Sequence, residues 1–375
     1  MRIAIVGGGI MGLCAAWALQ RDGYEVALFE QGPLPNPLGS SVDEHRLIRH
    51  PYGAERGYTR MINPAYAAWE QVWADIGARH YAATGTLVLD RGDRWTAATA
   101  AALEAERVPY RRLSVGEFST AFPMLTADGI RGALLLESGG TLFAADIVAD
   151  LARHLRRCGV RVAERSAVRE VDPEHGRVTL VAGDIIEADR VIVAAGPWAP
   201  RLIPGLRSRV TPSRQAVVYL EPPAERAAAW QRHPMILDID PAAGFYLVPP
   251  RPRASGAISG LKIGDHSFTL TGDPDRDREA TAEEAQRIVR QVGARLRDSG
   301  RYGIREAKTC FYDVTSDERF VVQPLATRGW ILGGFSGHGF KFAAVIGLEL
   351  ARTLRGERTS AALAAWAAGV LQDPP

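Results

Sequence analysis

The segment RIAIVGGGIMG, residues 2–12, is a short apolar run followed by closely spaced glycines. The pattern Gly7-x-Gly9-x-x-Gly12, between a predicted strand and a helix predicted from Met11 to Arg21, is typical of a dinucleotide-binding turn. The first glycine permits the tight turn, the second lets a pyrophosphate approach the backbone, and the third lets helix and strand pack closely. Free N–H groups and the positive dipole end at the helix start favour the anion.

A second strand is predicted at Glu25–Phe29 and is followed by Glu30. A carboxylate at this position accepts hydrogen bonds from a ribose 2′-OH and disfavours a 2′-phosphate. The glycine motif alone does not separate NAD from FAD. Its position near residue 1, with further α/β segments returning late in the chain, favours FAD.

Composition places limits on the function. The chain has 375 residues, is 46% hydrophobic and carries a net charge of +2, so we expect about two domains and no nucleic-acid partner. No run of 18 apolar residues and no signal-peptide pattern occur, so neither a membrane span nor secretion is expected. The three cysteines form neither a disulfide framework nor a zinc motif, which favours the cytoplasm and no metal site.

The predicted elements alternate between two patterns. Segments of α/β type lie at the start, middle and end of the chain, and the stretches between them resemble antiparallel sheet with a few helices. We therefore expect an α/β (α+β) protein in which a Rossmann-like FAD-binding domain is interleaved with a substrate domain built on a mainly antiparallel sheet with helices. The expected FAD-binding domain comprises residues 1–85, 141–209 and 310–375, and the substrate domain comprises 86–140 and 210–309.

Further predicted helices and strands complete this pattern. Helices are predicted at Ala97–Arg107, Ala145–Arg157, Thr281–Arg297 and from about Phe340 to Arg355, and a helical region contains Trp69 and Trp73. Strands are predicted at Thr84–Leu89, Arg161–Val162, Arg190–Ala195, Val210–Leu220, Gly244–Pro249 and Trp330–Gly333.

Lysine is rare in this chain. Lys and Arg total 45, but only three of these residues are lysines, namely Lys262, Lys308 and Lys341. Arginine supplies nearly all the positive charge, so lysine is expected mainly where a compact ammonium is needed and a planar guanidinium does not serve.

A glycine-rich segment, GGFSGHGFK at residues 333–341, lies between a predicted strand and the last long helix. Glycines let the backbone approach a flat ligand, and the helix start directs N–H groups at it. The edge of a flavin ring that gains negative charge on reduction suits this position.

Several motifs together resemble the monomeric sarcosine oxidase group of the D-amino-acid-oxidase-like flavoproteins, which includes oxidases of sarcosine, N-methyltryptophan and pipecolate. The resemblance covers nearly the whole chain. It is carried by the glycine motif with Glu30 and by RLIRHPYG at residues 46–53, GLKIGDH at 260–266, CFYDVTSDE at 310–318 and GFSGHGFK at 334–341.

The resemblance implies how FAD is held. Cys310 matches the residue that carries FAD as an 8α-S-cysteinyl flavin, which is chemically reasonable because a thiolate adds to the electrophilic 8α carbon. The residues expected to bind the cofactor are Gly7, Gly9, Gly12, Glu30, Ser40, Arg46, Cys310, Gly334, Gly337, His338, Gly339 and Lys341.

The resemblance also implies catalytic roles. Lys262 is expected above the flavin, where a fixed cation stabilises the anion formed when oxygen takes up an electron. Arg49 and Lys341 match the pair that binds the substrate carboxylate. His266, Tyr312 and Tyr246 match positions lining the flavin or the substrate. The expected reaction is oxidation of the C–N bond of an N-substituted or cyclic amino acid to an imine, with O2 reduced to H2O2, by a monomeric enzyme.

The loop Gly39–Glu44 departs from the group's pattern, because it is acidic where histidine and glycine are expected. Two alternatives stay open at this point: a dehydrogenase using another electron acceptor, and a flavin-binding partner subunit without turnover. A pyridine-nucleotide reductase is disfavoured because no second G-x-G-x-x-G occurs, and a serine hydrolase because no G-x-S-x-G elbow occurs.

Overall fold

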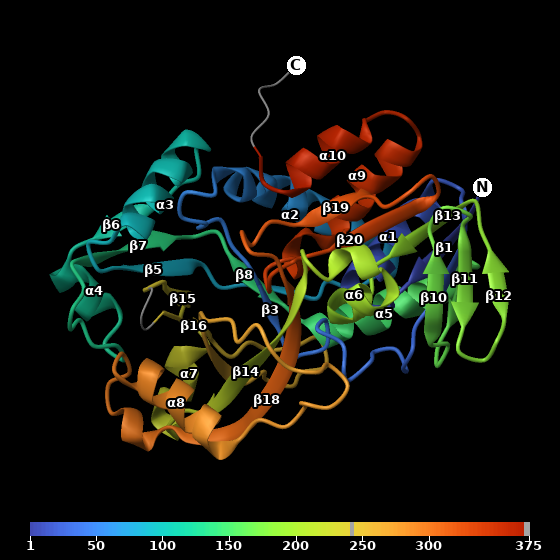
Figure 1. Cartoon of the computed structure of the whole chain (residues 1–375). Coiled ribbons are helices and arrows are strands. Elements are labelled where there is room, and N and C mark those ends of the chain that lie inside the picture. The colour runs from blue at the N-terminus through green and yellow to red at the C-terminus, as the bar shows by residue number, and fades with distance from the viewer. Residues whose placement is uncertain (241–243, 371–375) are drawn as a thin grey trace.

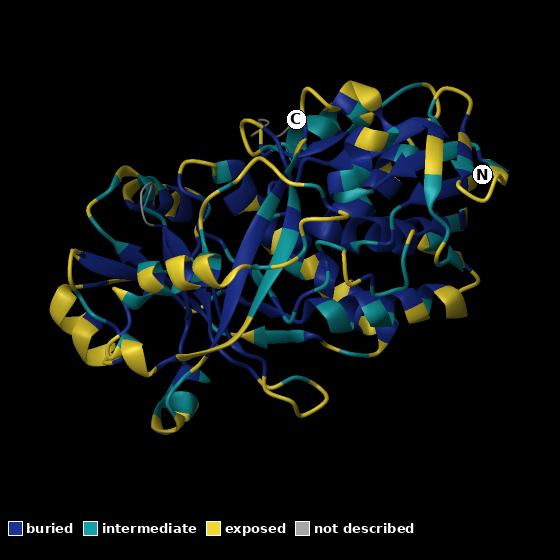
Figure 2. Ribbon diagram, turned by 60° about the horizontal axis from the view of Figure 1, so that its bottom comes forward, coloured by how far each residue is buried: buried dark blue, intermediate teal, exposed yellow. Residues whose placement is uncertain are grey.

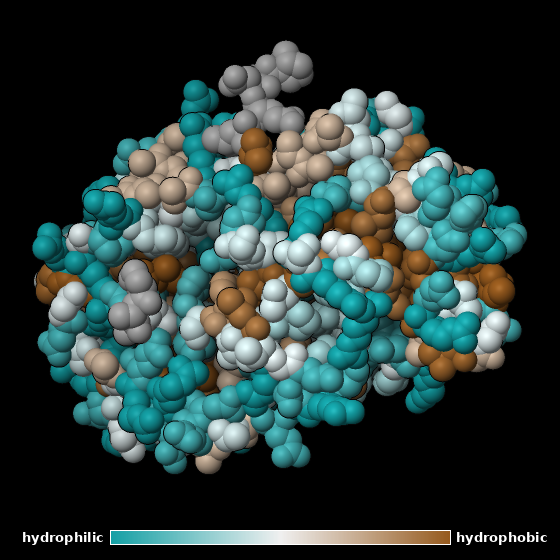
Figure 3. Space-filling view, in the orientation of Figure 1, coloured by the Kyte–Doolittle hydropathy of each residue, from teal (hydrophilic) through white to brown (hydrophobic). Residues whose placement is uncertain are grey.

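The computed structural model describes residues 1–240 and 244–370. Two large sheets lie toward opposite ends of the molecule, and helices cover them (Figure 1). Buried residues form the interior of both halves, and exposed residues line the outer loops and helix faces (Figure 2). On the face drawn in Figure 3 the periphery is largely hydrophilic, and hydrophobic side chains gather toward the middle and the right.

The first large sheet has six strands and contains the glycine motif. Its neighbours pair in parallel, except for one antiparallel pair at the edge, between β19 and β20. Its order is β19 (Val321–Pro324), β20 (Gly329–Gly333), β13 (Arg190–Val193), β1 (Arg2–Val6), β2 (Glu25–Phe29) and β9 (Arg161–Ala163). The expected strand–helix–strand unit is therefore present, with α1 (Ile10–Arg21) between β1 and β2.

Two further helices, α5 (Ala144–Arg157) and α9 (Ala343–Leu354), pack against α1. The contact between α1 and α9 requires glycine at position 347, because a Cβ there would lie 2.5 Å from the Cys14 carbonyl oxygen. All of α1 from Ile10 to Leu19 is buried by this packing. The helix that presents its N-terminus to the glycine motif is therefore held by one helix from the middle of the chain and one from its C-terminal part.

The second large sheet has eight strands and is antiparallel except between β15 and β5. Its order is β18 (Gly303–Val314), β14 (Thr211–Glu221), β17 (Leu261–Asp265), β16 (Phe245–Val248), β15 (Met235–Asp238), β5 (Thr86–Asp90), β7 (Gly132–Leu136) and β6 (Arg111–Leu113). The predicted mainly antiparallel second sheet is present. The proposed division into domains stays a prediction, and its boundary at residue 310 falls inside β18.

The remaining elements are smaller. Two three-stranded sheets contain β3 (Arg46–Ile48), β8 (Gly140–Leu142) and β4 (Tyr81–Ala83), and β10 (Val168–Asp172), β11 (Arg177–Leu180) and β12 (Ile185–Glu187). The other α-helices are α2 (Arg56–Ile76), α3 (Arg94–Ala105), α4 (Val115–Ala121), α6 (Ala199–Leu202), α7 (Ala224–Trp230), α8 (Ala282–Gly293) and α10 (Ser360–Ala367). Short 3₁₀ helices are η1 (Gly196–Trp198), η2 (Pro204–Leu206), η3 (Ser299–Arg301) and η4 (Phe340–Phe342).

Three predicted helices differ from the observed ones. The helix expected over Ala97–Arg107 is α3, which spans Arg94–Ala105 because Asp93 caps its start. The helix expected over Thr281–Arg297 begins as predicted, with Thr281 and Glu284 forming a capping box, but ends at Gly293. The chain then turns, and Leu296 forms a bridge with Leu125, so these apolar residues belong to a loop and not to a helical face. The helix expected from Phe340 begins as the 3₁₀ turn η4 and becomes α-helical at Ala343.

Helix α2 fixes the position of η4. The Trp69 and Trp73 rings stack with centroids 5.1 Å apart, and Trp69 stacks on Phe340 at 6.1 Å. The buried indole N–H of Trp69 donates a 2.8 Å hydrogen bond to the Lys341 carbonyl oxygen. Within the described residues, none of the helices has both the length and the hydropathy that crossing a bilayer requires.

Candidate active site

The first cavity, about 390 Å³ in volume, opens at the carboxyl end of β1. Of the predicted cofactor residues, it is lined by Gly7, Gly9, Glu30, Ser40, Arg46, Gly337 and Gly339. Gly7 has a φ of +109°, and a Cβ there would lie 2.4 Å from the Ala194 carbonyl oxygen. A Cβ on Gly12 would lie 1.9 Å from the Gly7 carbonyl oxygen, so the third glycine permits close packing, as its position predicts.

Glu30 is held rigidly at the end of β2. One carboxylate oxygen accepts a 2.7 Å hydrogen bond from the Gly8 amide. The other accepts hydrogen bonds from the Gly32 amide at 2.9 Å and the Asn36 side-chain amide at 2.7 Å. These donors fix an acidic group on the cavity wall, at the place where a ribose hydroxyl is bound in dinucleotide folds.

The glycine-rich segment after β20 forms another part of this wall. Gly337 has a φ of +77°, and a Cβ there would lie 2.4 Å from the Tyr312 ring. Ser40 also lines this cavity and donates a hydrogen bond to the Phe311 carbonyl oxygen. Cofactor-binding segments that are far apart in sequence therefore meet around one cavity.

A second cavity, about 460 Å³ in volume, adjoins the first. The two cavities share Arg46, Tyr312, Gly337 and Phe340 as common wall residues. The second cavity is lined by every side chain predicted to be catalytic: Arg49, Tyr246, Lys262, His266, Tyr312 and Lys341. His338, predicted as a cofactor residue, also lines the second cavity.

Arg49 and Lys341 meet around Tyr52. The buried Lys341 ammonium donates hydrogen bonds to the Tyr52 hydroxyl at 2.9 Å and to the His338 carbonyl oxygen at 2.8 Å. The Arg49 guanidinium carbon lies 4.4 Å from the Tyr52 ring centroid. Burial and the neighbouring Arg49 hold the pKa of Lys341 well below its usual range. In the described part of the chain neither cation forms an ion pair, so this corner of the cavity suits a ligand carboxylate.

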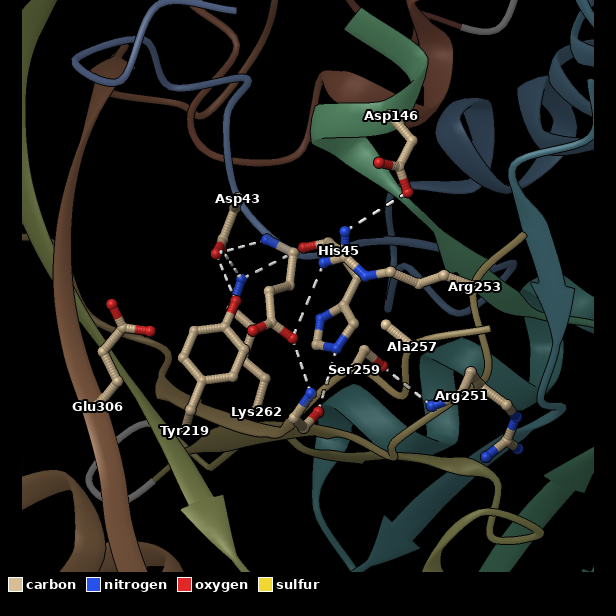
Figure 4. Close-up of polar contacts among 12 residues, drawn as sticks. Asp43, His45, Asp146, Tyr219, Arg251, Arg253, Ala257, Ser259, Lys262 and Glu306 are labelled. Carbon is tan, nitrogen blue, oxygen red and sulfur yellow. Dashed lines mark hydrogen bonds and ion pairs between the residues drawn. The ribbon is translucent and has the colours of Figure 1, made fainter. Parts of the chain in front are cut away.

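Lys262 lies in a different electrostatic setting. It projects from β17, is buried, and its ammonium lies 2.5 Å from the Asp43 carboxylate. Asp43 also pairs with Arg46 and accepts a hydrogen bond from the Tyr219 hydroxyl. Figure 4 shows Asp43, Tyr219 and Lys262 pointing toward one another from separate segments.

Comparison with known proteins identifies the family to which the chain belongs. The family described as DAO, FAD dependent oxidoreductase, matches residues 2–353. The chain belongs to this family. The family resemblance stated from the sequence is therefore confirmed, and the protein is an FAD-dependent oxidoreductase.

Individual DAO-family proteins align over nearly the full chain. Monomeric sarcosine oxidase of Arthrobacter sp. (strain TE1826) is 26% identical over 359 residues, which is 93% of this chain and 91% of that protein. Peroxisomal sarcosine oxidase of Homo sapiens is 28% identical over 357 residues, 92% and 89% of the two chains. The solved structure of L-proline dehydrogenase from P. horikoshii superposes with a TM-score of 0.82 at 20% identity, covering 98% of this chain and 96% of that chain, which supports the fold.

The two histidines predicted for this site have lowered pKa values and are neutral at pH 7. His266 lines the second cavity and is exposed to solvent on its outer side; the protein packed around the ring, followed by the charge of Arg49, lowers its pKa. Burial and the charge of Lys341 keep the pKa of His338 well below its usual range. Burial also raises the pKa of the Tyr246 and Tyr312 phenols, which keep their protons.

Some of the residues predicted to bind the cofactor do not line either cavity. Within the described residues, Gly12, Gly334 and Cys310 line neither cavity. Cys310 lies on β18, two residues before Tyr312, which lines both cavities. Burial raises the pKa of the Cys310 thiol, and the nearby charges of Arg46 and Lys262 act in the opposite direction.

Sequence reasoning missed three residues of the site. Tyr52 belonged to a quoted motif but received no role, and Asp43 was noted only as part of an unusually acidic loop. Asp313 lines the first cavity with a buried carboxylate oxygen for which the described structure offers no hydrogen-bond partner. Burial raises its pKa to about 6. Asp313 lies within the motif at residues 310–318, and this position was the sequence signal that could have identified it.

Proposed function

We propose that this protein is an amine oxidase that oxidises the C–N bond of an N-substituted or cyclic amino acid to an imine and reduces O2 to H2O2. The observation that supports this most strongly is that the partly buried Arg49 and the buried Lys341 lie together in a cavity that shares its wall with the dinucleotide cavity. A carboxylate held there lies next to the cofactor site. In the balanced reaction the amine loses two electrons and two protons, which O2 gains.

The residues of the first cavity fit FAD. The glycine turn leaves room that a Cβ would fill, and Glu30 presents a fixed acceptor for a ribose hydroxyl. The partnerless oxygen of buried Asp313 adds a polar group that a bound ligand would satisfy. When bound, FAD supplies the two-electron acceptor that amine oxidation requires.

The side chains of the second cavity define how a substrate would lie. Arg49 and Lys341 would hold its carboxylate, with Tyr52 keeping the two cations apart. The neutral rings of His266 and His338 add no competing positive charge. The cavity is also lined by apolar and aromatic side chains, namely Leu47, Trp95, Leu237, Ile239, Val248 and Phe268. This lining favours a substrate with an apolar body, oriented by its carboxylate.

We also propose that FAD is attached covalently through Cys310. The motif resemblance supports this assignment. In the structure, Tyr312 on the same strand borders the cofactor cavity, and the charges of Arg46 and Lys262 offset part of the burial that raises the pKa of the thiol.

A second candidate is a dehydrogenase that uses another electron acceptor. The observation in its favour is that Lys262, the residue assigned to oxygen, is paired with Asp43. Pairing offsets part of the positive field that would stabilise an oxygen anion. The two candidates share the substrate reaction and differ only in the acceptor.

The test begins with an absorption spectrum of the purified protein, repeated on the pellet after acid precipitation. A flavin spectrum that stays in the pellet supports covalent FAD, and one that moves to the supernatant removes the Cys310 assignment alone. N-methyl and cyclic amino acids are then screened with peroxide detection, with the decarboxylated amines as controls. Turnover with a dye but not with oxygen supports the dehydrogenase. Turnover of the decarboxylated amines at equal efficiency would contradict the carboxylate clamp.

A further inference from the structure

The acidic loop before β3 places a carboxylate in the protein interior. Asp43 is 8% exposed. Its carboxylate receives the Lys262 ammonium at 2.5 Å, the Arg46 guanidinium, the Tyr219 hydroxyl and the Glu44 amide at 2.8 Å. Four donors therefore converge on one side chain.

These donors come from separate parts of the fold. Tyr219 on β14 and Lys262 on β17 are register partners across an antiparallel pair, so their side chains lie on the same face of the sheet. Arg46 begins β3, and the loop that carries Asp43 brings its carboxylate onto this cross-strand pair (Figure 4). The backbone carbonyl of Asp43 accepts a 3.2 Å hydrogen bond from the Ala145 amide, which holds the loop against α5.

We propose that Asp43 is a positioning residue for Lys262, which fixes the ammonium group and keeps it protonated beside Arg46. The function of Lys262 toward oxygen rests on the proposed function above. The pairing of Asp43 with Lys262 does not depend on it.

The electrostatic argument follows from burial. Two cations in a buried site repel each other, and desolvation favours the neutral amine of a lysine. The ionisable groups around Lys262 are Asp43, Arg46, Cys310, Tyr246, His45 and the register partner Tyr219, whose phenol keeps its proton. Burial lowers the pKa of Lys262, the charge of Asp43 raises it, and the charge of Arg46 lowers it. Asp43 is the one fully ionised anion of this set, since the Lys262 and Arg46 charges hold its pKa well below the usual range despite its burial.

Lys341 provides an internal comparison. Lys262 and Lys341 are 3% and 4% exposed, and each has an arginine neighbour that lowers its pKa, Arg46 and Arg49 respectively. Lys262 has a carboxylate partner, whereas in the described residues Lys341 has none. The two lysines are thus equally buried but differ in the one feature that the proposal concerns.

The protonation state of Lys262 can be measured directly by NMR, because the sequence contains only three lysines. Lysine labelled with ¹³C and ¹⁵N at its terminal positions gives three side-chain signals in the flavoprotein, and Lys308→Arg, Lys262→Met and Lys341→Met assign them. We expect Lys341 to lose its proton before Lys262 as the pH rises. Loss of the Lys262 proton at or below the midpoint of Lys341 would overturn the proposal without any Asp43 variant.

The decisive variant is Asp43→Asn, which keeps the shape and removes the charge. We expect the Lys262 midpoint to fall by at least about one pH unit, since an opposite charge at this range shifts a pKa by about 1–3 units. The matched control is Glu44→Gln in the same loop, which removes a carboxylate paired with Arg305 and not with Lys262. An unchanged Lys262 midpoint in folded Asp43→Asn, or an equal fall in Glu44→Gln, would contradict the assignment.

A second readout is reoxidation by oxygen of photoreduced protein, which needs no substrate. Because the ammonium form is present below the lysine pKa, the rate should fall as the pH rises through that pKa. This fall should occur at lower pH in Asp43→Asn and be absent in Lys262→Met. If the protein binds no flavin, the proposed function fails while the lysine titration still tests the pairing. If amines are oxidised but the Lys262 midpoint does not depend on Asp43, this inference alone fails.

Discussion

The Tyr52 hydroxyl accepts a 2.9 Å hydrogen bond from the Lys341 ammonium, while the face of its ring lies against Arg49. One phenol therefore lies between two cations, the buried Lys341 and the partly buried Arg49. A carboxylate entering this corner meets two positive groups in a fixed arrangement. Hydrogen bonds between charged partners contribute about 1.5–3 kcal/mol each.

Replacing Lys341 with Met should therefore lower kcat/KM for an amino-acid substrate by about 10- to 100-fold, the equivalent of those energies. Steady-state kinetics with the amino acid and its carboxamide measure this effect. The carboxamide, which has no negative charge, should lose much less. Equal losses for the two substrates would show that Lys341 supports the fold of the site and not the carboxylate.

Cys310→Ser should leave a protein that binds flavin reversibly. The hydroxyl is far less acidic than the thiol and does not form the linkage, but the first cavity keeps its glycines and Glu30. Flavin absorbance after acid precipitation should move from pellet to supernatant. Cys14→Ser is the control, because this cysteine is buried in α1. Flavin retained in the pellet of Cys310→Ser would exclude the assigned attachment site.

Lys262→Met should slow reoxidation of the reduced flavin by oxygen far more than reduction by substrate, because a buried cation near the cofactor stabilises the anion of oxygen. Removing one such electrostatic group costs on the order of 10²–10³-fold in rate. Stopped-flow absorbance follows the two half-reactions separately. Lys308→Met, which removes a partly exposed lysine paired with Glu306, should change neither. Equal slowing of both half-reactions would remove the assigned role.

The raised pKa of Asp313 predicts a stability effect that depends on pH. Its folded-state pKa of about 6 exceeds the unfolded value of about 3.9, so the folded protein binds this proton more tightly. The group therefore destabilises the fold above pH 6, and this cost disappears as the pH falls below about 4. Asp313→Asn should raise the free energy of unfolding by about 2–3 kcal/mol at pH 8 and change it little near pH 4.

Urea unfolding of the wild type and Asp313→Asn across this pH range measures that difference. A variant that is less stable at pH 8 would show that the ionised carboxylate makes favourable contacts, such as those with the backbone amides near Gly334 and Phe335. The pH 4 comparison serves as the control, since in the folded protein the carboxyl and amide side chains are then both neutral.

The elements around the glycine motif were predicted to the residue or nearly so. β1, α1 and β2 follow from local rules: a run of apolar residues, a turn that only glycine can form, and Gly23 after the helix. The strands β3, β4 and β8 were not predicted. Each has three residues, and they pair only because β8, from a distant part of the chain, lies between the other two.

The candidate site was predicted through motif resemblance, and the structure places its side chains around two adjoining cavities. The resemblance assigned Lys262 a role but did not predict its partner. Asp43 and Lys262 are 219 positions apart, and their contact depends on the pairing of β14 with β17 and on the path of an irregular loop. Neither the strand pairing nor the path of the loop produces a periodic pattern in the sequence.

Strand β18 constrains how this protein can change over evolutionary time. Its pairing with β14 is regular from Val314 back through Cys310, so Cys310 and Tyr312 project to one face and Phe311 and Asp313 to the other. Insertion of a single residue would exchange the two faces and put a phenylalanine where the thiol now lies. Length variation among descendants of this gene should therefore fall in the loop after β17 or around η3, and chimeras should join outside residues 303–314.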